Sequence, residues 1–133
     1  MTGVQTCALP IYRRAAALLR RGPEVTSRLA EEYRERREVF FEGLEAAGLA
    51  PPWKPQGAYY VLVDVSGFGR GADVDCARWM VEEVGVAAVP GSSFFNDPKE
   101  GAPFLRFAFC KKLETLREAG RRLKAARAAE ARR

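Results

Sequence analysis

Apolar side chains recur with helical spacing through the first half of the chain. The longest such segment begins at Pro23, a residue that suits the first turn of a helix because its missing N–H is not needed there. The apolar positions that follow are Val25, Leu29, Tyr33, Phe40, Leu44 and Ala47. Spacings of three, four and seven predict one apolar stripe on a helix of about 25 residues, which Gly48 ends.

Three further segments have a helical pattern. A shorter helix is expected from Tyr12 to about Arg21, and another over residues 73–84, with Asp73 as its cap and Gly85 as its end. The expected inward positions of this second helix are Val74, Ala77, Met80, Val81 and Val84. A last helix is expected from about Leu113, and its inward positions are Leu113, Leu116, Ala119, Leu123 and Ala126.

Runs of aromatic and β-branched residues predict three strands, at residues 58–65, 86–89 and 102–110. Turn-forming residues between the last two predict a long loop. The fold class is therefore α/β or α+β, with a long N-terminal helix and a small mixed or antiparallel sheet of about three strands or more, on which helices pack. Residues 1–11 follow neither pattern, and we expect them to be an extraneous leader that is not native to the protein.

Composition narrows the possible chemistry. The chain of 133 residues contains no histidine, which excludes histidine bases, histidine metal ligands and Ser/His/Asp catalysis. Its three cysteines are widely spaced and form no CxxC pair, so a reducing cytoplasm fits best. The net charge of +5 lies in helical segments where Arg alternates with Ala, Leu and Glu, which favours solvated helix faces over a nucleic-acid surface. No apolar run is long enough to cross a membrane.

Arg106 is the most informative single residue, because it interrupts the apolar strand "APFLRFAFC". Two interpretations stay open from the strand alone. The guanidinium can extend outward to water along its own aliphatic stem. Alternatively, it can bind a carboxylate through two parallel hydrogen bonds, for which arginine is better shaped than lysine.

Other candidate groups have weaker patterns. "VPGSSFF" (89–95) follows a strand and offers hydroxyls, but it lacks the spacing of a phosphate-binding loop, so an ordinary turn is favoured. Phe94 within it can pack in the core or line an apolar pocket. Asp64 has no second carboxylate at a useful spacing and is expected to act in a turn. Lys111 and Lys112 form an adjacent pair of cations at a strand-to-helix junction, which favours solvation over Schiff-base chemistry.

Four stretches together resemble a known family. They are "YRERREVFFEGLEAAGL", "PPWKPQGAYYVLVDVS", "EEVGVAAVPGSSFF" and "FLRFAFCKKLETLREAGRRL". In order and spacing they are similar to the C-terminal part of the class I/II, fold-type I, pyridoxal-phosphate-dependent aminotransferases, over roughly residues 12–126. The "FCKK" ending looks closest to the kynurenine/glutamine/methionine aminotransferase branch.

The resemblance implies an interdomain helical segment at residues 12–48 and the small C-terminal domain at residues 49–133. It implies that Arg106 binds the α-carboxylate of an amino acid or a 2-oxo acid, with Phe94 near the mouth of the active site. It also implies that the parent enzyme is a homodimer.

The same resemblance implies what this chain lacks. The family's Schiff-base lysine and its other residues for pyridoxal 5'-phosphate belong to a large domain, and none of them has a matching position here. We therefore expect no catalytic and no cofactor-binding residue in the chain, no metal site, and no activity of the chain alone. The alternative is a free-standing α/β module that binds a small carboxylate through Arg106.

Overall fold

A computed structural model describes residues 5–132, with side chains from residue 10 onward. The chain divides into two compact units, residues 1–34 and 35–133, and the division falls inside a helix. The first unit contains α1 (Gln5–Leu19) and the start of α2 (Pro23–Ala46). Helix α1 begins seven residues before Tyr12, so part of the expected leader is helical, while residues 1–4 of that leader lie outside the described part.

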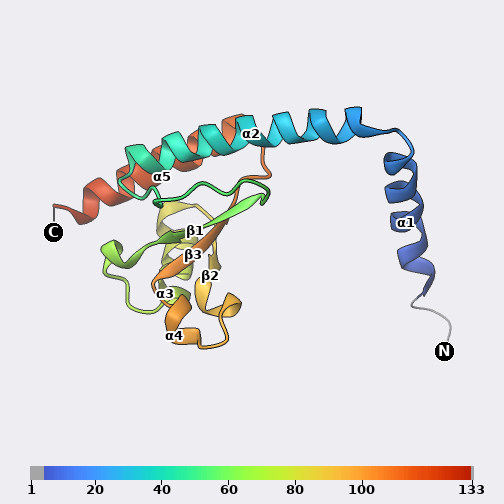
Figure 1. Ribbon diagram of the computed structural model, residues 1–133. Coiled ribbons are helices and arrows are strands. Elements are labelled where there is room, and N and C mark those ends of the chain that lie inside the picture. Colours follow the sequence, from blue (N-terminus) through green and yellow to red (C-terminus); the bar gives the residue numbers. More distant parts are fainter. Residues whose placement is uncertain (1–4, 133) are drawn as a thin grey trace. The chain divides into compact units, whose positions relative to one another are not determined.

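The second unit is built on a three-stranded antiparallel sheet with the order β1-β3-β2 (Figure 1). The strands are β1 (Tyr60–Asp64), β2 (Val89–Pro90) and β3 (Phe104–Ala108). The last strand of the chain is thus the central one, hydrogen-bonded to both of the others. This confirms the predicted fold class, and the sheet is antiparallel throughout.

The two faces of the sheet differ in character, as the strand alternation requires. One face buries Val61 and Val63 of β1 and Leu105 and Phe107 of β3. Helices supply the rest of this core: the main buried residues are Phe40, Phe41 and Leu44 of α2, Cys76, Ala77 and Met80 near the middle of the chain, and Leu116 and Leu123 of the last helix. Full burial of a Val, Leu, Phe or Met side chain among these contributes about 1.5 to 3 kcal/mol. The opposite face of the sheet carries Arg106.

Helices α2 and α5 (Leu113–Glu130) lie side by side over part of their length (Figure 1). Their backbones meet at two glycines, since a Cβ added to Gly43 would stand 2.8 Å from the Cα of Gly120. Only a residue without a side chain fits such an approach. Gly48, with a φ of 66°, follows α2 in the left-handed conformation and ends it, as predicted.

The helix predicted at residues 73–84 is present but changes form. It consists of α3 (Asp73–Trp79) and a π-helical turn, η2 (Met80–Val84), and Gly85 closes it with a φ of 70°. The buried positions are Asp73, Cys76, Ala77 and Met80, so the prediction that Val74 and Val81 face inward is wrong: they are 49% and 53% exposed. The buried residues follow helical spacing of three and four from Asp73, so the inner face of this helix includes a polar residue that the apolar pattern did not count.

The second predicted strand is also shorter than expected. Residues 86–88 are not in a strand, because the Val86 N–H bonds to the Met80 carbonyl and completes the end of the helix. Pairing with β3 begins only at Val89. The loop that follows contains a 3-10 turn, η3 (Gly91–Phe94), and one helical turn, α4 (Pro98–Gly101), which the Asp97 side chain caps by accepting from the Lys99 N–H.

Candidate carboxylate-binding site

Arg106 lies at the centre of the outward face of the sheet. In the strand register it stands opposite Leu62 on β1 and opposite Val89 on β2. Residues directly opposite in antiparallel strands point to the same face, so both flank its side chain. Because β3 is paired on both edges, the backbone that carries this arginine is fixed from two sides.

The guanidinium of Arg106 has no protein acceptor for one of its donors. Its Nε is buried and makes no hydrogen bond, and among the described residues no carboxylate forms an ion pair with it. A buried charged donor without a partner is costly. Such a group at the surface of a sheet fits an anionic ligand that supplies the missing acceptor.

Two aromatic rings contact this guanidinium. Its Cζ lies 5.0 Å from the ring centroid of Tyr60 and 4.3 Å from that of Phe94. Phe94 was a candidate from the sequence, and the structure brings it to Arg106. Tyr60 was missed, because its contact depends on the register of β1 against β3, which places Tyr60 opposite Ala108 and diagonal to Arg106. The one available signal was the alternation of Tyr60, Leu62 and Asp64 on one face of the predicted strand.

A buried carboxylate holds the segment that carries Phe94. Asp73 is 4% exposed; its Oδ2 accepts from the Ser92 N–H at 2.7 Å and its Oδ1 from the Val74 N–H at 3.0 Å. Burial alone would raise the pKa of Asp73, but these N–H groups and the Ser92 hydroxyl outweigh it, and the pKa is lowered. The prediction that Asp73 is the helix cap is wrong, since Ala72 occupies that position. Asp73 instead joins α3 to η3, and the Ser92 N–H is not available to a phosphate.

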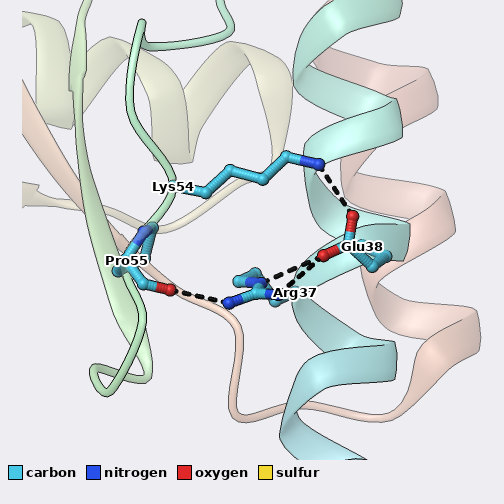
Figure 2. Close-up of polar contacts among 4 residues, drawn as sticks. All are labelled: Arg37, Glu38, Lys54 and Pro55. Carbon is cyan, nitrogen blue, oxygen red and sulfur yellow. Dashed lines mark hydrogen bonds and ion pairs between the residues drawn. The ribbon is translucent and has the colours of Figure 1, made fainter.

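A second polar cluster, the Glu38 clasp (Arg37, Glu38, Lys54 and Pro55), fixes the chain before β1 (Figure 2). Lys54 donates to Glu38 at 2.7 Å, and Arg37 donates both to Glu38 and to the Pro55 carbonyl, the latter at 2.9 Å. Hydrogen bonds from Lys54 and then from Arg37 lower the pKa of Glu38. The clasp therefore attaches the segment leading to Tyr60 to helix α2.

The other candidates lie apart from this arrangement. Asp64 accepts from the Ser66 N–H at 2.9 Å and from the Ser66 hydroxyl at 2.6 Å, which confirms its turn role. Cys76 is buried and Cys110 is half-buried, and neither forms a disulfide. The described residues contain no group of three His, Cys, Asp or Glu side chains that could hold a metal ion. None of the described helices is long and apolar enough to cross a membrane.

Comparison with known proteins identifies the family. The model of the family "Aminotransferase class I and II" matches residues 8–123. The chain belongs to the class I and II aminotransferases. These enzymes depend on pyridoxal phosphate, whose chemistry is that of an electron sink for the amino acid.

Individual aminotransferases are similar over most of the chain. The methionine aminotransferase of Escherichia coli (strain K12) is 35% identical over 115 residues, which cover 86% of this chain and 29% of the relative. Kynurenine–oxoglutarate transaminase 1 of Mus musculus is 33% identical over 100 residues, covering 65% of this chain and 23% of the relative. A crystal structure of an Escherichia coli protein with a methionine aminotransferase function superimposes with a TM-score of 0.71 at 36% identity, over 84% of this chain and 28% of that one. The chain thus spans under a third of the length of these aminotransferases.

The surroundings of the lysines in the described chain do not fit a Schiff base with the family's cofactor. A Schiff-base lysine requires a desolvated or electropositive site that favours its neutral form. All five lysines of the chain, Lys54, Lys99, Lys111, Lys112 and Lys124, are exposed. The candidate ligand-binding group among the described residues is therefore the guanidinium of Arg106, whose buried Nε lacks an acceptor.

Proposed function

We propose that this chain is the C-terminal substrate-binding part of a pyridoxal-phosphate-dependent amino-acid aminotransferase. In that enzyme, Arg106 binds the α-carboxylate of the amino-acid donor and of the 2-oxo acid. The observation that carries the proposal is the buried Nε of Arg106, which has no acceptor in the described protein. Membership of the aminotransferase family supports it, because every substrate of the reaction carries a carboxylate next to the reacting carbon.

The chemistry of the guanidinium suits this role. Its planar donors match the two oxygens of a carboxylate, and bonds between two charged groups are stronger than neutral ones. The side chains opposite Arg106 in the strand register, Leu62 and Val89, are apolar and do not compete for its donors. A bound carboxylate would give the buried donor the partner that it lacks.

The proposal extends to what the chain leaves to the rest of the enzyme. We infer that the Schiff-base lysine comes from a large domain outside these residues, that the chain alone does not catalyse transamination, and that the parent enzyme is a homodimer. The exposed state of all five lysines supports the first two inferences. Cys76 and Cys110 are unpaired, which supports action in a reducing compartment, the cytoplasm.

Substitution of Arg106 in an enzyme that contains this segment tests the clamp. Arg106→Lys keeps the charge but removes the planar pair of donors, so kcat/KM for the amino acid should fall by about a hundredfold or more, with cofactor binding retained. Lys111→Arg, at an exposed position, is the matched control and should leave kcat/KM unchanged. An Arg106→Lys enzyme with normal dependence on amino acid would contradict the assignment.

The inactivity of the chain alone has a separate test. Pyridoxal phosphate is added to the 133-residue chain, borohydride reduces any imine, and mass spectrometry locates the label. We expect only scattered, substoichiometric labelling of the exposed lysines. Stoichiometric trapping at one lysine would show that the chain carries a cofactor site of its own.

A further inference from the structure

The two rings beside Arg106 come from different elements. Tyr60 is the first residue of β1, and Phe94 ends η3, which follows β2. Because β3 lies between β1 and β2, one ring reaches the guanidinium from each neighbouring side of the sheet. Both contacts fall within the range of cation–π interactions, with centroid distances of 5.0 and 4.3 Å.

Ordinary core packing does not account for these rings. Tyr60 is 37% exposed and Phe94 is 46% exposed, whereas the aromatic residues of the core, such as Phe41 and Phe107, are at most 2% exposed. Each ring leaves a large part of its surface open and yet contacts the arginine. The rings are therefore not ordinary core residues, and their contact with the guanidinium needs another explanation.

An arginine side chain is flexible, and a carboxylate that accepts from its planar fork of donors can fix its orientation. Arg106 has no such partner among the described residues, so its orientation before a ligand arrives depends on the rings. Binding that must first order a flexible side chain loses affinity to that ordering. When aromatic rings already pack against the guanidinium, its N–H donors are oriented before the ligand binds, and less free energy is lost in ordering the side chain.

We propose that Tyr60 and Phe94 are positioning residues that hold the Arg106 guanidinium in its carboxylate-binding orientation. The proposal rests on the proposed role of Arg106 and assigns the rings a function in affinity for the carboxylate rather than in contact with the substrate side chain. Each ring is itself held by a polar tie: the Glu38 clasp fixes the segment before Tyr60, and Asp73 fixes Ser92, two residues before Phe94.

The test follows the NMR signal of the Arg106 Nε–H group in the ¹⁵N-labelled 133-residue chain, and sodium acetate is added as the carboxylate ligand. Two quantities are recorded: the dissociation constant for acetate, and the rate of rotation about the Nε–Cζ bond without acetate. Tyr60→Leu and Phe94→Leu should each weaken acetate binding about three- to fivefold and should speed the rotation. Tyr60→Phe, which keeps the ring and loses the hydroxyl, should retain both values.

Trp53→Leu is the matched control, because Trp53 is an aromatic residue with 52% exposure and no contact with Arg106 in the described structure. It should change neither quantity, and the amide spectra of all variants should stay native. If Arg106→Lys binds acetate as well as the unaltered chain, the proposed clamp is wrong. If Arg106→Lys loses binding while both leucine variants keep binding and slow rotation, the clamp stands and the positioning role is wrong.

Discussion

Substitution of Asp73 by Asn removes a buried charge while keeping the shape of the side chain. In the folded chain each carboxylate oxygen accepts one backbone N–H, from Ser92 and from Val74. Asparagine has one acceptor oxygen, and its NH₂ group would face the other N–H. The variant should therefore lose one charge-assisted hydrogen bond completely and weaken the second.

The magnitude follows from the two contacts. A hydrogen bond to a charged group contributes about 1.5 to 3 kcal/mol. Since one is lost and one becomes a neutral bond, Asp73→Asn should lower the free energy of unfolding by about 2 to 4 kcal/mol. Asp75→Asn is the matched control: Asp75 is exposed in the same first turn of α3, so it shares only the helix-dipole effect, about 0.3 to 1 kcal/mol.

Urea unfolding followed by circular dichroism at neutral pH measures both variants. The sign of the pH dependence is also fixed, because the pKa of Asp73 is lowered on folding from its ordinary 3.8. The carboxylate therefore contributes its full stability above that value and loses it as the pH falls through the lower folded pKa. The difference in the free energy of unfolding between the unaltered chain and Asp73→Asn should therefore become smaller in this acidic range. An Asp73→Asn variant that is no less stable than Asp75→Asn would refute the tie between α3 and η3.

Three further predictions concern the second unit. Gly43→Ala should lower the free energy of unfolding by about 1 to 3 kcal/mol in urea unfolding, because its methyl group would meet the backbone of Gly120, whereas Gly57→Ala, with nothing near its added Cβ, should cost less than 1 kcal/mol. Glu38→Gln should reduce the free energy of unfolding above the ordinary glutamate pKa of 4.5 and lose this effect as the pH falls through the lowered pKa; an acid titration of stability checks this, and a constant difference at all pH values would contradict it. A thiol reagent should label Cys110 well before Cys76, as followed by mass spectrometry. Cys76 is only 2% exposed, and its burial also raises the pKa of its thiol. Equal labelling rates for the two cysteines would contradict the burial of Cys76.

Local patterns were enough to predict most of the helices and strands. The helix from Pro23 and the strand that contains Tyr60–Asp64 were specified by their apolar patterns and by glycine or proline near their ends, and the final helix by its apolar spacing alone. The failures occurred where a distant contact decided the outcome. Residues 86–88 left the predicted strand because the Val86 N–H bonds to a helix carbonyl, and Asp73 left its predicted capping role because its partner, Ser92, lies nineteen residues away.

The same distinction holds for the residues of the candidate site, since local sequence indicated some of them and only distant contacts place the others. Arg106 was visible as a charge in an apolar strand, and Phe94 through its place in a family pattern. Tyr60 was not, because its place beside Arg106 requires both the antiparallel register and the strand order β1-β3-β2. A strand order that departs from chain order depends on contacts between segments far apart in the sequence, and no local segment contains that information.

The central position of β3 links the candidate site to cooperative unfolding. Strands β1 and β2 are each paired with β3 and not with each other, so when β3 detaches the sheet ceases to exist. Backbone amides of β3 should therefore exchange with solvent only through opening of the whole unit, whereas the amides of a surface loop exchange through local openings. A carboxylate bound at Arg106 would consequently raise the midpoint of thermal unfolding of the whole unit, and its affinity could be measured from that shift without any catalytic activity.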